Sequence, residues 1–234
     1  MTLLLSIDDT DTLNSRGTGR LARAIAALLE KEYPVLGVTR HQLFVHESIP
    51  YTSHNSCAVI HLGPCANDQE RRIFSLARDY MKEDFIEGSD PGIAIADLGA
   101  VTPAVVTFGQ HAKTMVLRQE QARALAKDNS IRLEGLGGSE DGVIGALAGI
   151  GLAATGNDGR YIQKGRIRDI TGPAPAELLL DAGIELILTT EGVPVTTGII
   201  QVQAGKSVKP CPVSGKTVLY VEEREGTFHA VKRD

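Results

Sequence analysis

Leu3-Leu4-Leu5-Ser6-Ile7-Asp8-Asp9-Thr10-Asp11 is the stretch around which the rest of the chain is arranged. Its apolar first half predicts a buried strand. Three carboxylates then follow within four positions, and they repel one another unless a cation or hydrogen-bond donors compensate their charge. Oxygen-only acidic clusters suit hard cations such as Mg²⁺, with a phosphate completing the ligand shell. The stretch therefore predicts a metal and phosphate site; the alternative is a solvated acidic turn.

An amphipathic helix is expected directly after these acids. Arg16-Gly17-Thr18-Gly19 leads into apolar residues at Leu21, Ile25, Leu28 and Leu29, which is the spacing of one helix face. Thr18 is the expected N-cap. Because the backbone donors of a helix N-terminus bind anions, Gly17 and Thr18 are predicted to contact a nucleotide phosphate beside the metal.

The composition restricts the classes of function. The chain has 234 residues, a net charge of −5, aromatic residues at 4% and no Trp, which argues against a non-specific nucleic-acid binder and leaves few stacking platforms for bases. Cys57, Cys65 and Cys211 show no CxxC spacing, so a reducing, cytoplasmic location is expected. No signal peptide or membrane segment is expected from the hydropathy pattern.

A second notable segment, from Gly135 to Gly151, is rich in glycine. It predicts a glycine loop, a cap at Ser139 and a helix of very small residues. Glycine within a helix costs about 1 kcal/mol relative to alanine, so Gly142 and the helical glycines after it need an offsetting benefit. One interpretation is a tightly packed buried helix. The other is a phosphate-binding loop in which Gly138, Ser139 and Gly142 contact a nucleotide, and spacing alone leaves both open.

The remaining pattern mixes strands and helices without strict alternation, so the predicted class is α+β (mixed α/β). Further strands are expected at residues 42–46, 57–62, 93–96, 161–170, 184–188, 197–202, 217–221 and 227–231. Helices are expected from a cap at Asn67 or Asp68 to residue 83, from Thr102 onward, and at 119–128 and 174–181.

Four blocks, in order, resemble the archaeal tRNA isoleucine agmatinylcytidine synthetases. They are Ile7 to Asp11 with Arg16-Gly17; Ile49-Pro50-Tyr51 before Ala58-Val59; Gly142 to Ala148 with Asp158 and Tyr161; and Pro210 to Val213. The resemblance implies a kinase-like nucleotide-binding module with a ferredoxin-like subdomain across residues 1–234, with no internal boundary assigned. It also implies ATP and Mg²⁺ as cofactors and the Gly142 segment near the phosphates.

The resemblance implies that Asp8, Asp9 and Asp11 are metal and catalytic acids. Asp8 and Asp11 are expected to hold Mg²⁺ on the triphosphate, while Asp9 orients the substrate or acts as a base. Asp158 is a candidate third metal ligand, and its alternative role is that of a turn residue before Gly159.

The departures from that family shape the functional hypotheses. The family's OB-fold and zinc-ribbon domains have no counterpart in this sequence. Its basic residues are replaced at Thr52, His54 and Ser139-Glu140-Asp141, and basic groups are what hold polyphosphate and RNA. The leading hypothesis is a Mg²⁺-dependent, ATP-using enzyme that acts by phosphotransfer or activation on a small-molecule or partner-bound substrate.

Two alternatives remain. One is a non-catalytic ligand-binding homologue. The other is a component of tRNA cytidine modification that works with a separate RNA-binding chain, in which Arg160, Lys164, Arg166 and Arg168 form an RNA-facing strand. A homo-oligomer is compatible with either alternative.

Overall fold

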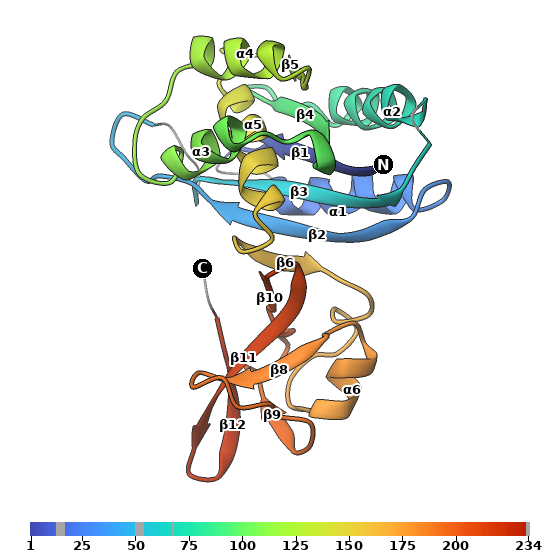
Figure 1. Ribbon diagram of the computed structural model, residues 1–234, viewed down its shortest axis with the longest axis vertical. Coiled ribbons are helices and arrows are strands. Elements are labelled where there is room, and N and C mark those ends of the chain that lie inside the picture. The colour runs from blue at the N-terminus through green and yellow to red at the C-terminus, as the bar shows by residue number, and fades with distance from the viewer. Residues whose placement is uncertain (13–16, 50–53, 67, 233–234) are drawn as a thin grey trace. The chain divides into compact units, whose positions relative to one another are not determined.

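Two compact units make up the chain, Met1–Thr155 and Gly156–Asp234. The computed structural model describes residues 1–12, 17–49, 54–66 and 68–232. The first unit combines several helices with a sheet, and the second combines a sheet with one helix among its described residues (Figure 1), so the predicted α+β class is confirmed.

The first unit contains an antiparallel sheet with β1 near its centre. Its strands are β1 (Thr2–Asp8), β2 (Val35–Gln42), β3 (Ser56–Pro64), β4 (Gly92–Asp97) and β5 (Arg132–Gly135). Within this unit their order is β5-β4-β1-β3-β2. Both neighbours of β1 run antiparallel to it, and Asp8 pairs with Gly92. The loop before β4 is therefore brought beside the acidic end of β1.

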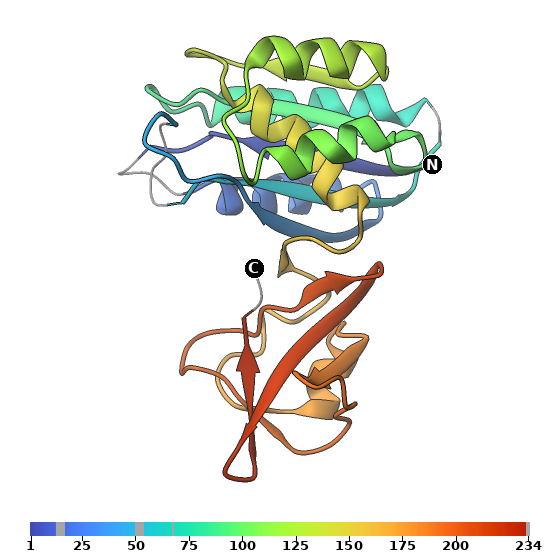
Figure 2. The same cartoon turned by 60° about the vertical axis from the view of Figure 1, so that its left-hand side comes forward.

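Helices cover both faces of this sheet. They are α1 (Thr18–Leu29), α2 (Gln69–Glu83), α3 (Pro103–His111), α4 (Gln119–Asp128) and α5 (Gly142–Ala154), with a short 3₁₀ helix η1 (Leu98–Ala100) after β4. The order β1-α1-β2-β3-α2-β4 with sheet order β4-β1-β3-β2 is a ferredoxin-like arrangement. Figure 2 shows α5 crossing one face of the sheet, with α1 on the other.

Alternate residues of β1 serve the two faces. Leu4 belongs to the core formed with α3, α4 and α5, and Ser6 and Asp8 point the same way because the side-chain period is two. Leu3, Leu5 and Ile7 are fully buried on the opposite face. The continuous apolar run therefore reflects burial on both sides, as predicted.

Glycines let α5 approach its neighbours closely. A Cβ at Gly149 would lie 2.3 Å from Ser6 Oγ, and one at Gly151 would lie 2.1 Å from the backbone oxygen of Val105 in α3. Almost every residue of α5 is buried. The packed-helix interpretation of this segment is therefore confirmed.

The second unit has its own sheet and core. Its elements are β6 (Arg160–Gln163), β7 (Ala174–Pro175), α6 (Ala176–Asp181), β8 (Leu186–Thr189), β9 (Ile199–Gln201), β10 (Cys211–Val213), β11 (Lys216–Arg224) and β12 (Thr227–Val231). The strand order is β10-β11-β12-β9-β7, and β8 pairs in parallel with β11. Tyr161, Ile167, Leu179, Ile200 and Leu219 are among its core residues.

Two strand predictions are wrong. The strand expected at 42–46 lies instead at Val35–Gln42, because the amides of Leu43 and Phe44 donate to Asn55 O and Ala112 O outside the ladder. The strand expected at 161–170 ends at Gln163. There the chain turns at Gly165, where φ is +46°.

Two helix caps are also placed differently. Thr18 is the first helical residue and Gly17, with φ at 78°, is the N-cap. Asp141 occupies the N-cap position of α5 in place of Ser139. Asp68 is the N-cap residue of α2 without a side-chain cap bond, whereas Asn67 lies outside the described residues.

Two global features follow from these elements. Within the part of the chain that the structure describes, no helix combines the length and the hydropathy needed to cross a membrane. The three cysteines are buried, and none of them forms a disulfide.

We predict that Gly151→Ala destabilises the protein. Alanine normally favours an exposed helix by about 1 kcal/mol over glycine, but here the new methyl would meet the Val105 carbonyl, so we expect the unfolding temperature to fall by roughly 3–10 °C. Gly99→Ala is the control because its nearest neighbour would be 3.8 Å away. An unfolding temperature of Gly151→Ala at or above wild type would contradict this packing.

Candidate active site at the end of strand β1

A pocket opens in the first unit at the C-terminal end of β1. Five aspartates line it: Asp8, Asp9, Asp11, Asp90 and Asp141. An apolar wall completes it, formed by Leu43, Ile49, Ala112, Met115, Val116, Leu117 and Ile144. None of its described lining residues is Lys or Arg. The pocket therefore combines strong negative charge with a surface suited to an uncharged part of a ligand.

Asp8 is the most deeply placed of these acids. It is 8% exposed, and a Cβ at Gly145 of α5 would lie 1.7 Å from Asp8 Oδ2. Burial, together with the nearby Asp9 and Asp11 carboxylates, raises the pKa of Asp8 to about 8, although a hydrogen bond from the Asp9 backbone partly offsets this rise. The site therefore favours the neutral acid unless a cation is bound.

Asp9 lines the pocket and has an unusual backbone conformation. Its φ is +50°, the left-handed region that Asp and Asn enter more readily than other side chains. Burial raises the pKa of Asp9 to about 6, and the carboxylates of Asp90, Asp11 and Asp141 add to the rise. Such backbone strain is typical of functional sites.

Asp11 is tied to the start of α1 by two hydroxyl groups. Thr18 Oγ1 donates to Asp11 Oδ1 at 3.1 Å, and Thr10 Oγ1 donates to Thr18 Oγ1 at 3.2 Å. Gly17 lies alongside, since a Cβ there would be 3.8 Å from Asp11 Oδ2. Thr18 thus orients an acid, and the structure brings Gly17 and Thr18 to the acidic cluster as the sequence predicted.

The glycine loop before α5 is held by its own hydrogen bonds. The amide of Ser139 donates to Asp90 Oδ1, and that of Gly142 donates to Asp90 O at 2.9 Å. The amides of residues 140, 141, 143 and 144 donate within the same turn. These bonds favour packing over phosphate binding, and a nucleotide contact from Gly138, Ser139 or Gly142 stays a prediction that requires some of them to break.

Gly138 and Ser139 lie beside Asp90 but do not line the pocket. Asp158 belongs to the second unit, and its role as a ligand stays a prediction. Arg16 and the segment from Pro50 to Ser53 lie outside the described residues.

Sequence reasoning missed two acids and the apolar wall. Asp90 belongs to no motif in the sequence, and only the antiparallel pairing of β1 with β4 brings it beside Asp8. Asp141 is marked in the sequence only as one of the positions where the resembling family has a basic residue. Residues 112–117 carry no motif, although the exposure of Met115 and Val116, at 45% and 47%, is unusual for apolar side chains.

The donor set is compatible with a magnesium ion that is shared with a phosphate. Among the described residues, no three His, Cys, Asp or Glu side chains converge into a self-sufficient metal site. Mg²⁺ commonly uses one or two carboxylates and completes its shell with water and substrate phosphates. Asp8 and Asp11 carry carboxylate oxygens of that kind, and their role as metal ligands stays a prediction.

The fold is shared with solved tRNA-modifying enzymes. No protein-family model and no curated protein matches the chain. Apo TiaS, a tRNA agmatidine synthetase, matches with a TM-score of 0.55 at 23% identity, over 64% of this chain and 35% of that one.

Two TiaS complexes match similarly. The complex of TiaS with tRNA and ATP gives a TM-score of 0.56 at 24% identity, and the complex with tRNA, AMPCPP and agmatine gives 0.54 at 21%. Each match covers 64% of this chain and 36% of the other. The resemblance found in the sequence is thus confirmed as a likeness of fold, and this chain spans little more than a third of those proteins.

We predict that Asp8→Asn stabilises the ligand-free protein, and more so as the pH rises. Below about pH 4 the folded and unfolded states both hold the Asp8 proton, but between about pH 4 and 8 only the folded state keeps it. The free energy of unfolding of the wild type therefore falls across that window. Asparagine removes this loss, so we expect an unfolding temperature higher by roughly 3–8 °C at pH 8 and nearly equal at pH 4.

Thermal unfolding without divalent cations measures this effect. Asp128→Asn, at the exposed end of α4, is the matched control and should change little at either pH. An Asp8→Asn variant that is less stable than wild type at pH 8 would show that the ionised Asp8 carboxylate does not destabilise the folded protein.

Proposed function

We propose that this chain is a magnesium-dependent, ATP-using enzyme that transfers a phosphoryl group to, or activates, a small-molecule or partner-bound substrate. The observation that carries this proposal is the acidic pocket. Five aspartates meet there with no Lys or Arg among the described lining residues, so the pocket favours a ligand that arrives with positive charge. Mg²⁺ supplies that charge at the carboxylates, and the same ion binds the phosphates of a nucleotide.

Asp8 and Asp11 are the residues proposed to hold the metal. When bound, Mg²⁺ neutralises phosphate charge and lowers the proton affinity of nearby carboxyls. Asp8 would then lose the proton that burial makes it retain. Thr18 keeps Asp11 oriented through the hydrogen bond from its hydroxyl.

Asp9 is proposed to orient the acceptor substrate or to act as its general base. Its raised pKa, about 6, lies close to neutrality, where a general base combines availability with proton affinity. The apolar wall of the pocket would hold an uncharged part of the ligand and exclude water from the phosphoryl transfer. Support for the nucleotide comes from the matched TiaS structures, which include complexes with ATP and AMPCPP.

Calorimetric titration of ATP tests the binding half of the proposal. We expect binding to wild type that requires Mg²⁺, and at least about tenfold weaker binding to the Asp8→Asn/Asp11→Asn double variant, because both anionic ligands are lost. Asp128→Asn serves as the control. No binding of Mg²⁺–ATP to folded wild-type protein would sink the proposal.

Turnover separates an enzyme from the alternative, a non-catalytic binder. Asp9→Asn should retain Mg²⁺-dependent ATP binding but lose ATP turnover by about 100-fold or more, since a general base contributes that much. Equal turnover by this variant and wild type would contradict a catalytic role for Asp9. Binding without turnover in the wild type would favour the non-catalytic homologue.

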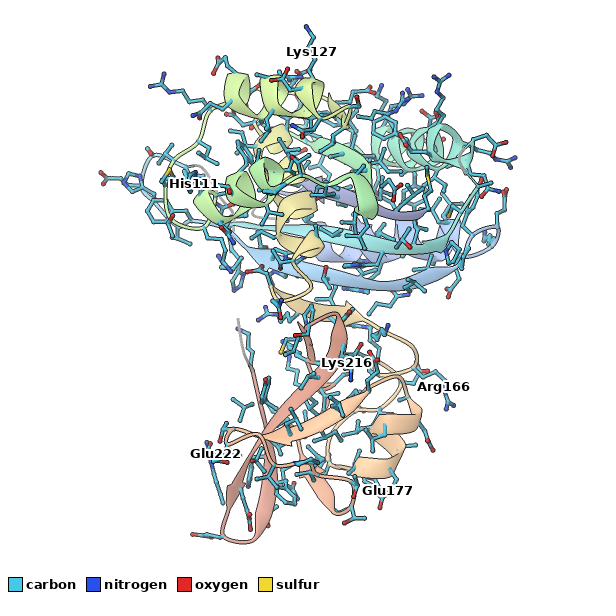
Figure 3. All side chains as sticks on the ribbon, in the orientation of Figure 1. His111, Lys127, Arg166, Glu177, Lys216 and Glu222 are labelled. Carbon is cyan, nitrogen blue, oxygen red and sulfur yellow. The ribbon has the colours of Figure 1, made fainter. Side chains whose placement is uncertain are left out.

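A second candidate function is that of a tRNA-modification component that works with a separate RNA-binding chain. A hollow in the second unit favours it: Lys206, Lys209, Arg224 and Lys232 line it beside His229, and Glu222 is the acid among its described lining residues. An adjoining hollow adds Arg168. Figure 3 shows Glu222 and Lys216 on β11 in this unit. The expected RNA-facing strand is not formed, since Arg160 is 8% exposed and residues 164–168 lie outside β6.

Salt dependence tests this second candidate. Contacts from four or five cations to a single-stranded backbone would give a slope of about −3 in log K against log salt concentration. Lys206→Glu/Lys209→Glu should weaken RNA binding and leave Mg²⁺–ATP binding unchanged. A shallow slope, or no effect of the double variant, would contradict an RNA-binding role for this hollow.

A further inference from the structure

The start of α4 is hydrogen-bonded to Asp141, one of the acids that line the pocket. Gln119 is its first residue, and its Nε2 donates to Ser139 O and to Asp141 Oδ1, both at 2.7 Å. The segment just before it supplies Met115, Val116 and Leu117 to the apolar wall. Gln119 therefore links Asp141 to the segment that supplies part of the apolar wall.

The orientation of this amide is defined by its partners. Arg123, one turn further along α4, donates from Nη2 to Gln119 Oε1 at 3.3 Å and to Glu140 Oε2 at 2.5 Å. A flipped Gln119 would set its oxygen against two acceptors and its NH₂ group against a guanidinium. Only one orientation satisfies all these groups.

The loop that Gln119 grips has a backbone that needs support. Gly138 and Glu140 have φ values of +59° and +65°, and the second is uncommon for a residue with a side chain. Asp90 stabilises the loop because it accepts hydrogen bonds from the Ser139 and Gly142 amides. Gln119 and Arg123 stabilise the same loop through their hydrogen bonds to Ser139 O, Asp141 Oδ1 and Glu140 Oε2.

We infer that Gln119 is a positioning residue of the pocket: it fixes the 136–141 loop and keeps the Asp141 carboxylate directed at the acidic cluster. Asp141 lines the pocket and acts on Asp9 through its charge. Loss of the Gln119 amide leaves Asp141 and the Ser139 carbonyl without this shared donor, so the loop samples other arrangements. The consequence for ligand affinity rests on the proposed function; the effect on the loop does not.

The test compares Gln119→Ala and Gln119→Glu with wild type. Gln119→Glu keeps the shape but sets a carboxylate against Ser139 O and Asp141. Lys127→Ala is the control on the same helix, where Lys127 points away from the body of the protein (Figure 3). Unfolding temperatures of all variants should stay within about 3 °C of wild type, because half-exposed and exposed sites change stability little.

Hydrogen–deuterium exchange in the ligand-free protein is the first readout. Amides of residues 139–144 should exchange at least about threefold faster in both Gln119 variants, with Gln119→Glu the faster, because opening of the loop becomes easier. Unchanged exchange in both variants overturns the inference, whatever the protein does with ATP.

Mg²⁺-dependent ATP binding is the second readout. We expect both Gln119 variants to bind roughly 5- to 10-fold more weakly, which is the scale of the net contribution of one ordinary hydrogen bond. Faster exchange with unchanged affinity would overturn the claim that the loop positions Asp141 for the ligand. If wild type shows no ATP binding, the proposed function fails, and the exchange data alone then decide the role of Gln119.

Discussion

The buried carboxyl group of Asp8 is the constraint on which the site depends. It lies at the end of a strand covered on both faces, and α5 can pass over it only because position 145 is glycine, where a Cβ would sit 1.7 Å from Asp8 Oδ2. Burial raises the pKa of this acid to about 8, so the ligand-free protein favours its neutral form. A bound cation would reverse that preference. The same close packing that stabilises the first unit thus prepares a site that responds to positive charge.

The antiparallel sheet assembles the rest of the pocket from segments far apart in the sequence. Because Asp8 pairs with Gly92, the turn with Asp90 lies next to the acidic end of β1. Asp90 then anchors the loop before α5 through its carboxylate and its backbone oxygen. The segment between α3 and α4 adds apolar residues to the lining of the pocket. Charge and apolar surface meet here because of topology rather than proximity in the chain.

The sequence predicts well where local pattern and burial agree. The apolar run before Asp8 forms the buried strand β1, and residues 119–128 form α4, both as predicted. The glycines of α5 indicate close packing that the structure confirms. It fails where a tertiary contact decides. Strand β2 lies earlier than expected because Leu43 and Phe44 hydrogen-bond outside the ladder, and Thr18 serves Asp11 rather than capping its helix. Asp90 and Asp141 join the site through strand pairing and a side-chain bridge, neither of which leaves a motif. The fold likeness to TiaS agrees with the four sequence blocks, while substrate and activity remain proposals.

A carbon-13 NMR titration of the aspartate carboxyl groups tests the central claim most directly. In metal-free protein, the Asp8 resonance should titrate near pH 8 and that of Asp9 near pH 6. With Mg²⁺ and ATP present, the Asp8 transition should move to lower pH by at least about one unit, because the cation stabilises the ionised form. An Asp8 group that titrates near pH 4 without metal, or whose transition does not move when Mg²⁺ and ATP are added, would contradict a buried acid that awaits a cation.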